Sequence, residues 1–527
     1  MCGRAAPAGP TPEPIFGHSF APRAISRTGR LAMGAWTFLV YPVRHMKVLF
    51  VTPPYHCGVV EVAGTWIPLQ YVYLAGAARA AGFDCEIYDA MSLDVGHREI
   101  ERKLDDARPD VVCVSAITAT YPDALEVARA AKARGATTVM GGVHPSFMWR
   151  EALADGGVDY VVTGEGEETL VELLRCLEAK DDPAKVAGVA FVKDGLPQRT
   201  PPRPRLASLD PQPMAFDLLD WSPYTYFVKP GSRLGAVSSS RGCTYACAFC
   251  SQTQFWEKTW RARDPACVAA EIAELRRRFG VDVVLLTDEY PTSDRARWEA
   301  FLDRMIELDL RVDLLMETRV QDIVRDADIL WKYVKAGVVH VYVGIEATDQ
   351  ATLNLVNKET TVDEGKRALE LLSAHDLVSE TSFVLGFPNE TKEHVRETLA
   401  LAKAYDPDFA HFLAIAPWPY AAMWTELEPH VVTRDYRKYN LIDPVVKPVA
   451  MTLREVDDAI VDCYRSFYFE KGRQLLAMKP GFRKEYVFRS MKLIMQSSFV
   501  RKKMLGRAMP EEVRSLLATL GRQVAGG

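Results

Sequence analysis

The chain has 527 residues, of which 48% are hydrophobic and 25% are charged, a composition typical of a globular protein long enough for two or three domains. A net charge of −5 argues against a nucleic-acid-binding protein. The ten cysteines are spread through too long a chain to be the disulfide framework of a small secreted domain. Outside one cluster, we expect these cysteines to be small buried apolar side chains: Cys85, Cys113, Cys176, Cys267 and Cys463.

Residues 1–45 differ from the rest of the chain. They are rich in Pro, Gly, Arg and Ala, and their apolar run at 31–43 is too short to span a bilayer and precedes no clear cleavage site. The stretch MKVLFVTPP, which begins at Met46, has the pattern of a first β-strand. We therefore expect translation to start at Met46, or residues 1–45 to be a disordered extension. Because no other segment resembles a transmembrane helix, we expect a cytoplasmic protein.

Residues 46–185 are predicted to form an α/β domain. Apolar runs alternate with helical patterns, and the runs lie at 47–54, 85–90, 111–117, 138–142 and 160–164. This order predicts five parallel strands with crossover helices, a doubly wound Rossmann-like sheet. Ligands of such sheets bind beyond the carboxyl ends of the strands. No GxGxxG follows the first strand, which argues against a dinucleotide, and the fold alone does not fix the ligand.

Two histidines follow strands of this domain. His56 lies in PPYHCG and His144 lies in GGVHPSF. Each can contact a ligand in the pocket or coordinate a metal ion, and the glycine-rich loop around His144 favours the pocket contact.

Residues 231–425 are predicted to form a second domain with the same alternation. Strands are predicted at 236–242, 282–289, 313–320, 340–347, 380–388 and 409–417, with helices near 264–279, 294–309, 325–336, 362–375 and 391–405. Six βα units are too few for a complete eight-fold barrel and predict a partial (β/α)6 barrel. The active sites of such barrels lie at the carboxyl ends of the strands.

The stretch RGCTYACAFC (241–250) directly follows the first predicted strand of this barrel and holds Cys243, Cys247 and Cys250. Structural zinc takes four ligands, often as two CxxC pairs, and no second pair or suitably spaced histidine is present. An iron–sulfur cluster normally takes four cysteines, so three leave one iron open to a small molecule. CxxxCxxC, with Phe249 before the last cysteine, resembles the signature of radical S-adenosylmethionine enzymes.

Further polar residues and glycine lie at the ends of the other predicted strands. Asp288 and Glu289 end the second strand, and their carboxylates can hold the ammonium group of a methionine moiety. Glu346 ends the fourth and can bind ribose hydroxyls or the amino group, while Gly386 and Pro388 in GFPNET can line the adenine. A salt bridge or cap within a loop is the alternative for each.

Longer strings resemble the anaerobic magnesium-protoporphyrin IX monomethyl ester oxidative cyclases of bacteriochlorophyll synthesis, within the cobalamin-binding class of radical S-adenosylmethionine enzymes. The strings are PPYHCGVVEVAGTW (53–66), GCTYACAFCSQTQFW, RDP (263–265), DEYPT, TRVQDI (318–323), AGVVHVYVGIEA, NKETTV (357–362), APWPY (416–420) and KYNLIDPVVKP (438–448). The similarity covers the chain from about residue 46 to about residue 505.

This resemblance implies three cofactors: a 4Fe–4S cluster on the three cysteines, S-adenosylmethionine and cobalamin. It implies that a 5′-deoxyadenosyl radical removes hydrogen from the ring-C propionate ester of a magnesium porphyrin. Oxidation, addition of water and closure of the isocyclic ring then give protochlorophyllide. An electron donor such as ferredoxin or flavodoxin is implied as a partner. No catalytic acid or base is assigned.

The resemblance also implies the cofactor contacts. Those expected for S-adenosylmethionine are Phe249, Asp288, Glu289, Glu346, Gly386 and Pro388. Those expected for cobalamin are His56, Ser115, Thr118, Gly141, Gly142, His144, Gly164 and Glu165. Many cobalamin domains carry DxHxxG, whereas the corresponding stretch here is DAMSLD (89–94), so the cobalt is expected to lack a histidine ligand.

Two regions remain outside these domains. Residues 186–230 are Pro-rich and predict a connector, with an independent recognition segment as the alternative. Residues 426–527 are predicted to be helical, with an apolar stripe that favours a core position: Tyr486, Val487, Ser490, Met491, Ile494 and Met495. The basic face beside it is either solvated or attracts a porphyrin carboxylate or an anionic membrane surface, which limits membrane contact to a peripheral one. APWPY can stack a macrocycle or belong to the core.

Three functions fit these observations. The first is the ring-forming cyclase, and the second is a cobalamin-dependent radical methyltransferase with the same cofactors and another substrate. The third is a cobalamin or iron–sulfur sensor, which would not need the residues predicted to hold S-adenosylmethionine.

Overall fold

The computed structural model describes residues 45–55, 63–210, 213–347 and 350–496. The chain divides into Met1–Arg44 and His45–Gly527, and the first of these units lies outside the described residues. The prediction of a late start or a disordered extension therefore also falls outside them.

The first sheet begins with the five predicted parallel strands. They are β1 (Lys47–Val51), β2 (Asp84–Tyr88), β3 (Val111–Ser115), β4 (Thr137–Gly141) and β5 (Tyr160–Val162). Their order in the sheet is β2-β1-β3-β4-β5, and each pair of neighbours is parallel. The strands are apolar along almost their whole length because helices cover both faces of the sheet.

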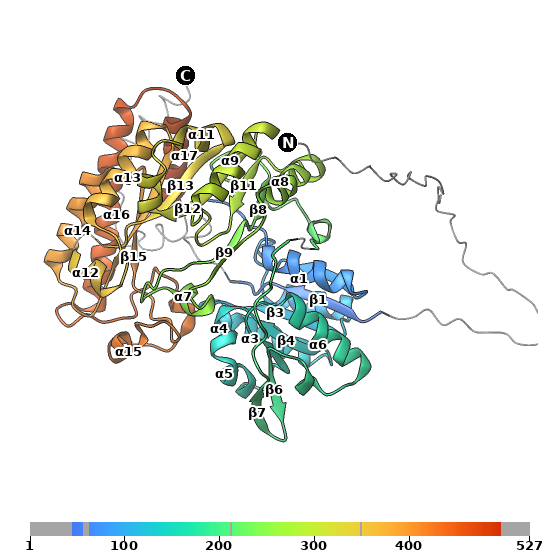
Figure 1. The fold of residues 1–527 in the computed structure, drawn as a ribbon. Coiled ribbons are helices and arrows are strands. Elements are labelled where there is room, and N and C mark those ends of the chain that lie inside the picture. Colours follow the sequence, from blue (N-terminus) through green and yellow to red (C-terminus); the bar gives the residue numbers. More distant parts are fainter. Residues whose placement is uncertain (1–44, 56–62, 211–212, 348–349, 497–527) are drawn as a thin grey trace, which may run out of the picture. The chain divides into compact units, whose positions relative to one another are not determined.

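Two layers of helices enclose this sheet (Figure 1). One apolar core joins it to α1 (Leu69–Ala80) and α6 (Glu167–Ala179). A second core, on the other face, joins it to α2 (His97–Ala107), α3 (Tyr121–Lys132) and α5 (Trp149–Ala154). The short helix α4 (Val143–Phe147) directly follows β4 and its glycine-rich end. The predicted Rossmann-like architecture is confirmed.

The sheet also extends into the predicted connector. The strands β6 (Val189–Lys193) and β7 (Leu196–Arg199) add an antiparallel hairpin beside β5. Its two-residue turn is Asp194–Gly195, with φ angles of 52° and 76°. Asp-Gly is a favoured sequence for this kind of turn, and the proline-rich composition around it obscured the signal. The connector beyond β7 packs Tyr224 and Tyr226 into the core of the second domain.

The second domain contains a sheet of six parallel strands. They are β8 (Leu234–Val237), β11 (Val283–Leu286), β12 (Asp313–Arg319), β13 (Val338–Gly344), β14 (Val378–Leu385) and β15 (Phe409–Ala414). Their order in space is their order in the chain, as expected of consecutive βα units. The predicted partial (β/α)6 barrel is confirmed.

Helices follow the strands of this barrel and lie outside its sheet (Figure 1). They are α8 (Pro265–Phe279), α9 (Arg295–Leu308), α10 (Val320–Arg325), α11 (Leu330–Ala336), α12 (Gln350–Leu355), α13 (Val362–Ala374) and α14 (Lys392–Tyr405). The string RDP marks the start of α8, where the Asp264 carboxylate accepts a hydrogen bond from the Ala266 N–H at 2.8 Å. Pro265 occupies the first helical position, where its missing N–H costs nothing.

The first predicted strand of the barrel, 236–242, is two strands in the structure. β8 ends at Val237, and β9 (Ser240–Gly242) pairs with β10 (Trp260–Ala262) in an antiparallel ribbon. The break falls at Ser238 and Ser239. The Ser238 hydroxyl donates to the carbonyl of Ser240, and the Ser239 hydroxyl donates to the carboxylate of Asp288. The cysteine motif therefore follows the ribbon strand β9 and does not directly follow the barrel strand.

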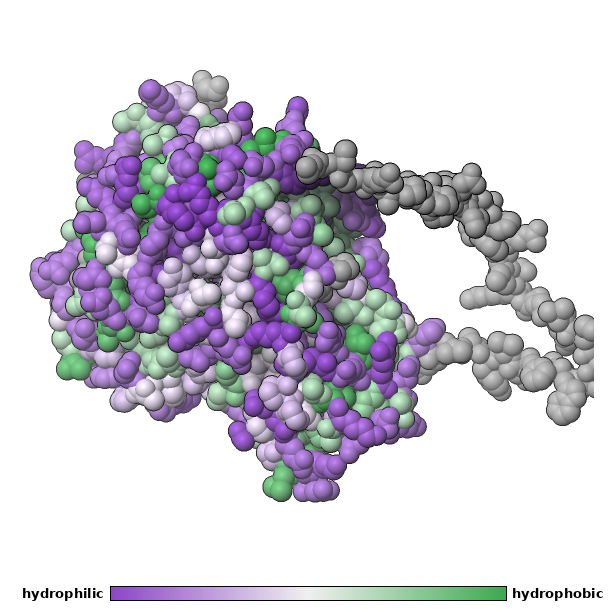
Figure 2. Space-filling view, in the orientation of Figure 1, coloured by the Kyte–Doolittle hydropathy of each residue, from purple (hydrophilic) through white to green (hydrophobic). Residues whose placement is uncertain are grey.

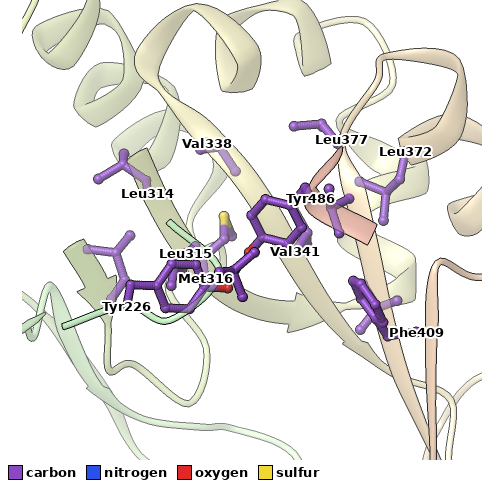
Figure 3. Packing of buried hydrophobic residues seen from close by; sticks show 14 of the residues in the cluster. Tyr226, Leu314, Leu315, Met316, Val338, Val341, Leu372, Leu377, Phe409 and Tyr486 are labelled. Atoms are coloured by element: carbon purple, nitrogen blue, oxygen red, sulfur yellow. The ribbon is translucent and has the colours of Figure 1, made fainter. Parts of the chain in front are cut away.

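The C-terminal region is helical, as predicted, with α15 (Trp424–Leu427), α16 (Leu453–Ala477) and α17 (Phe482–Gln496). The predicted apolar stripe of α17 is buried, which confirms its core position, although the side chain of Met495 lies outside the described part of the chain. Figure 3 shows Tyr486 among residues of the barrel strands, with its hydroxyl toward that of Tyr226 from the connector. The Tyr486 hydroxyl also lies 2.8 Å from Nδ1 of His340 on β13.

The predicted burial of isolated cysteines is correct at Cys85, Cys113, Cys176 and Cys463. It is wrong at Cys267, which is exposed in the first turn of α8. The buried stripe of α8 begins at the next residue, and Cys267 lies on the solvent side of this amphipathic helix.

The described helices include none that is long and apolar enough to cross a membrane. The face of the molecule in Figure 2 is mostly hydrophilic, with apolar residues in small scattered groups.

Replacement of Phe383 tests the barrel core. Phe383 on β14 is fully buried and stacks on Phe412 of β15, with ring centroids 5.7 Å apart. We expect Phe383→Ala to lower the free energy of unfolding by about 3–5 kcal/mol, because it removes apolar contacts and leaves a cavity. Phe482→Ala is the control, since that ring is 53% exposed. Urea denaturation measures both, and equal losses would contradict the packing described.

Candidate active site

The cysteine loop lies between β9 and α7 (Ser251–Phe255), and the β9–β10 ribbon closes its base. Gly242 enters the loop with φ at +92°, and a Cβ atom at this position would overlap the carbonyl oxygen of Thr259. Only glycine satisfies both constraints without displacing the backbone. The Gly in the string RGC is therefore set by the ribbon geometry.

The three motif cysteines differ in their surroundings. Cys247 is buried, while Cys243 and Cys250 are half-buried. The N–H of Gln252 lies 3.4 Å from Sγ of Cys250, and Nη1 of Arg319 lies 3.8 Å from Sγ of Cys247. Burial raises the pKa of Cys243 to about 11, so a nearby positive charge is needed to ionise this thiol. A soft metal centre would supply that charge.

The spacing of the three thiols fits an iron–sulfur cluster better than a single ion. Among the described residues, the only group that brings three ligand atoms within 4.8 Å of one another is His97, Asp123 and Glu126. Arg437 already forms ion pairs with both of its carboxylates. The cysteines are spread more widely than the ligands of one ion, as a cluster with an iron at each cysteine requires.

Asp288 lies at the end of β11 but is turned away from the lumen. Its side chain is fully buried and accepts hydrogen bonds from the N–H and the hydroxyl of Ser239, each at 2.9 Å. Ser240 donates a further bond at 2.5 Å. Burial raises the pKa of Asp288. These contacts make Asp288 an anchor for the loop between β8 and β9, and its contact with an ammonium group stays a prediction.

Glu289, the next residue, points to the cysteine loop. Its carboxylate accepts hydrogen bonds from the N–H of Gly242 at 3.1 Å and from Nε1 of Trp256 at 2.7 Å. Burial raises its pKa. Glu289 therefore holds both ends of the cysteine loop and also lines the cavity described below.

Glu346 follows β13 in a left-handed conformation, with φ at 68°. Its carboxylate accepts hydrogen bonds from Nζ of Lys358 at 3.0 Å and from the hydroxyl of Ser382 at 3.1 Å. The Ser382 hydroxyl also lies 2.5 Å from that of Tyr342. These bonds fix the Glu346 carboxylate at the carboxyl end of the sheet, where the prediction placed it.

Glu317 is an acidic residue that the sequence analysis missed. It lies on β12 two residues before Arg319, so the two side chains extend from the same face of the strand. The residue is partly accessible to solvent, yet the protein around its carboxyl and the negative charges of Glu289 and Asp288 raise its pKa to about 8. The available signal was an acid that directly follows the apolar run Leu314–Met316 of β12.

The remaining residues predicted to contact S-adenosylmethionine lie at the end of β14 and in the cysteine loop. Gly386 has φ at 86°, and its N–H donates to the Glu390 carboxylate at 3.1 Å. Pro388 is half-buried, and its carbonyl accepts a bond from Val449. Phe249 packs against a separate apolar cluster that includes Phe387, next to Gly386.

A cavity of about 380 Å³ joins the first sheet to the barrel. Five of the residues predicted to contact cobalamin line it: Ser115, Gly141, Gly142, Gly164 and Glu165. Glu289 of the barrel lines the same space. The cavity thus connects the carboxyl ends of both sheets, the position in which ligands of such sheets bind.

A buried ion-pair cluster fastens the two sheets beside this cavity. Arg241 of β9 donates at 2.9 Å to Glu165, in the loop after β5, and at 2.6 Å to Glu167, the first residue of α6. Arg261 of β10 donates to Glu165 at 2.9 Å, and the N–H of Leu206 donates to it as well. Burial opposes ionisation of Glu165, but these donors hold its pKa below the ordinary value. Glu165 therefore joins the sheets in addition to lining the cavity.

Thr118 and His144, also predicted as cobalamin contacts, are fully buried and do not line the cavity. The Thr118 hydroxyl lies 3.1 Å from Nδ1 of His144 and 2.9 Å from the hydroxyl of Tyr420. Tyr420, in the string APWPY, stacks on Phe147 with ring centroids 4.7 Å apart. Burial lowers the pKa of His144 to about 3, so the imidazole is neutral. This group ties the first sheet to the segment after β15.

His56, the other predicted histidine, lies outside the described residues. The loop after β2, which contains DAMSLD, is described, and Asp89 holds it by accepting bonds from Thr52 at 2.8 Å and from Tyr224 at 2.9 Å. The described residues that line the cavity include no histidine.

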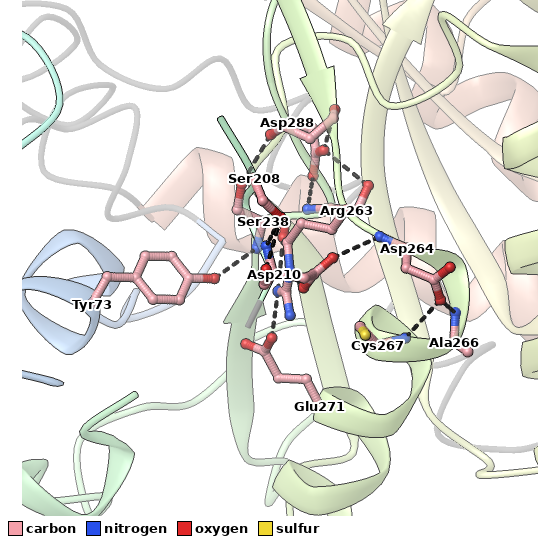
Figure 4. A network of polar contacts seen from close by, with 12 residues as sticks. Tyr73, Ser208, Asp210, Ser238, Arg263, Asp264, Ala266, Cys267, Glu271 and Asp288 are labelled. Carbon is pink, nitrogen blue, oxygen red and sulfur yellow. Dashed lines mark hydrogen bonds and ion pairs between the residues drawn. The ribbon is translucent and has the colours of Figure 1, made fainter. Parts of the chain in front are cut away.

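A second polar network, which the sequence analysis also missed, fixes the loop after β8 (Figure 4). The N–H of Ser238 donates to the hydroxyl of Tyr73 from α1 at 3.4 Å. Arg263 donates to the Ser238 carbonyl at 3.1 Å and to Asp210 of the connector at 2.7 Å, and it is also bonded to Glu271. Isolated arginines give no sign in the sequence of which carboxylates they meet.

Comparison with known proteins agrees with this architecture. The family model for the B12 binding domain matches residues 55–174, and the model for the radical SAM superfamily matches residues 237–402. An anaerobic magnesium-protoporphyrin IX monomethyl ester cyclase of Cereibacter sphaeroides is 37% identical over 467 residues, which cover 86% of this chain and 76% of that protein. One of the same name from Rubrivivax gelatinosus is 36% identical over 466 residues, 87% of this chain and 84% of that protein.

The chain belongs to the anaerobic magnesium-protoporphyrin IX monomethyl ester cyclase family. It is an enzyme of the cobalamin-binding radical S-adenosylmethionine class, and its cofactors are cobalamin, S-adenosylmethionine and a 4Fe–4S cluster. Membership of this family does not agree with the sensor hypothesis.

A solved structure shares the fold of this cyclase-family chain. It is the radical S-adenosylmethionine methyltransferase TsrM of Kitasatospora setae, with cobalamin and a [4Fe–4S] cluster bound. The TM-score is 0.65 at 18% identity, and the match covers 88% of this chain and 100% of that one. Because cyclases and a methyltransferase share the architecture, the fold does not select between these two reactions.

Gly242→Ala tests the geometry of the cysteine loop. We expect it to prevent normal closure of the β9–β10 ribbon, and so to reduce the iron and sulfide bound after anaerobic reconstitution to less than about a fifth of the wild-type content. Gly231→Ala is the control, because Gly231 is also left-handed, with φ at 77°, but has no atom within 4 Å of an added Cβ. Equal iron contents in the two variants would contradict the constraint at Gly242.

Glu165→Gln tests the ion pairs between the sheets. Loss of one partner of a buried pair costs about 3 kcal/mol at neutral pH. Because the folded-state pKa of Glu165 is depressed, the stabilisation is present above its ordinary value of about 4.3 and is lost as the pH falls through the folded value. Urea denaturation should therefore show a difference between variant and wild type at pH 7 that shrinks toward pH 3. A difference independent of pH would rule out the charge as its cause.

Proposed function

We propose that this enzyme catalyses the anaerobic oxidative cyclisation of magnesium-protoporphyrin IX monomethyl ester to protochlorophyllide, with the oxygen taken from water. The observation that carries the proposal is the 37% identity to a cyclase, which extends over both cofactor domains and well beyond them. The cavity supports it, because residues at the strand ends of both cofactor domains line this one space.

Residues in different parts of the site would hold different cofactor groups. Cys243, Cys247 and Cys250 hold the cluster, which together with S-adenosylmethionine supplies a radical able to remove hydrogen from an unactivated side chain. Glu289 and Glu346 hold the methionine and ribose groups from the ends of β11 and β13. Their contacts with Trp256 and Lys358 already fix both carboxylates in place.

The end of the first sheet would receive cobalamin. Ser115, Gly141, Gly142 and Gly164 border the cavity at the ends of β3, β4 and β5, where small side chains let a large ligand approach the backbone.

The reaction also needs a source of electrons, for which a ferredoxin or a flavodoxin has a suitable potential. A cytoplasmic location with at most peripheral membrane contact agrees with the absence of a membrane-spanning helix from the described part of the chain.

Anaerobic incubation of the reconstituted protein with the porphyrin ester, S-adenosylmethionine and a low-potential reductant tests the proposal. We expect protochlorophyllide together with 5′-deoxyadenosine, measured by absorbance and chromatography, because hydrogen removal precedes ring closure. Release of 5′-deoxyadenosine without protochlorophyllide would refute the cyclase reaction, and a methylated porphyrin would support the methyltransferase alternative.

Two cysteine variants provide matched controls. Cys247→Ala should lose the visible absorbance of the cluster and at least 99% of the activity, because it removes the buried ligand. Cys267→Ala should retain both, since that thiol is exposed on α8. If the Cys247→Ala variant keeps its activity, the cluster is not part of the mechanism.

A further inference from the structure

Three strings that identified the family lie together around the cysteine loop. They are GCTYAC before α7, TRVQDI at the end of β12 and NKETTV after α12. Nδ2 of Asn357 donates to the carbonyl of Ala246 at 3.1 Å, and the N–H of Ala248 donates to the carbonyl of Val356 at 2.9 Å. Backbone atoms within the cysteine motif are thus held from a segment more than a hundred residues away.

Arg319 lies where these three segments meet. It is the last residue of β12, and it is only 6% exposed. Its guanidinium carbon lies 3.3 Å from the centre of the Tyr245 ring, and Nη1 lies 3.8 Å from Sγ of Cys247. Nη2 donates to the carbonyl oxygens of Lys358 and Glu359. Every contact except that with the sulfur holds the guanidinium in one orientation, with Nη1 directed at Cys247.

The surroundings of Arg319 differ from those of Arg241 and Arg263. Arg241 and Arg263 each form ion pairs with carboxylates. Among the described residues, no carboxylate forms an ion pair with Arg319, which contacts two carbonyls, an aromatic ring and the sulfur. Because the site is screened from water, a positive charge this close to a thiolate acts on it strongly.

We propose that Arg319 is a positioning residue that raises the reduction potential of the cluster by stabilising negative charge on the sulfur of Cys247. Reduction adds an electron to the cluster, and N–H groups and positive charge at a ligating sulfur favour the more negative state. Tyr245 supports this role as the ring on which the guanidinium rests. The inference rests on the cluster ligands of the proposed function but not on its substrate.

The test is a redox titration of the full-length protein after anaerobic reconstitution with iron and sulfide, followed by electron paramagnetic resonance without substrate. We expect Arg319→Gln to disfavour reduction at least tenfold, which is 59 mV toward more negative potential for one electron. Arg319→Lys keeps the charge and should stay within about threefold of the wild type. Arg325→Gln is the matched control, because Arg325, the last residue of α10, donates to the carbonyl of Thr292 and to Asp326 and should leave the equilibrium unchanged.

Each outcome decides the question. An Arg319→Gln variant with the full iron content and an unchanged potential would overturn the proposal. If that variant binds too little iron to titrate, the Lys variant decides: a potential close to the wild type supports the charge effect, and a shift of tenfold or more at full iron content overturns it. A wild-type protein that binds no cluster would instead refute the cysteine site, so failure of the two assignments can be distinguished.

Discussion

The ion pairs of Arg241 with Glu165 and Glu167 are the constraint on which the candidate site depends. Arg241 is the residue two positions before the first motif cysteine, and the two acids lie between the last parallel strand of the first sheet and the first turn of α6. One guanidinium therefore fixes the start of the cysteine loop relative to the proposed cobalamin side of the cavity. Because its partners are charged and buried, displacement of either sheet would leave an unpaired charge in a dry environment.

Inside the barrel, acidic side chains outnumber basic ones, whereas each acid in these ion pairs meets an arginine. Asp288, Glu289, Glu317 and Glu346 all act on the electrostatics of one region, and Lys358 opposes them. The pKa of Glu317 is raised first by burial and then by this excess of carboxylates. The excess favours a ligand that brings positive charge, and S-adenosylmethionine carries both a sulfonium and an ammonium group. The gathering of like charges thus serves ligand binding at the site and does not stabilise the fold.

Sequence reasoning predicted the strands, most helices and the cysteines, because each follows from a local pattern of apolar spacing or ligand spacing. It could not predict the direction in which a side chain at a strand end points. Asp288 and Glu289 are adjacent in sequence, yet only Glu289 reaches the cavity, since Ser239 and Ser240 enclose Asp288. Glu317 and Arg319 went unnoticed because one charged residue in a strand has no meaning until its neighbours are known.

The fold alone does not account for the difference between this family and the methyltransferases that share it. The similarity to the cyclase of Cereibacter sphaeroides covers 86% of the chain, far more than residues 55–174 and 237–402 that match the two cofactor domains. The additional similarity must therefore include parts of the connector and the C-terminal region. Those parts supply Tyr226 and Tyr486 within the barrel and Tyr420 against the first sheet. The elements that close both sheets around the shared cavity thus lie outside the two cofactor-domain matches, and because the TsrM match covers 88% of this chain, it is their residues and not their presence that can distinguish the family.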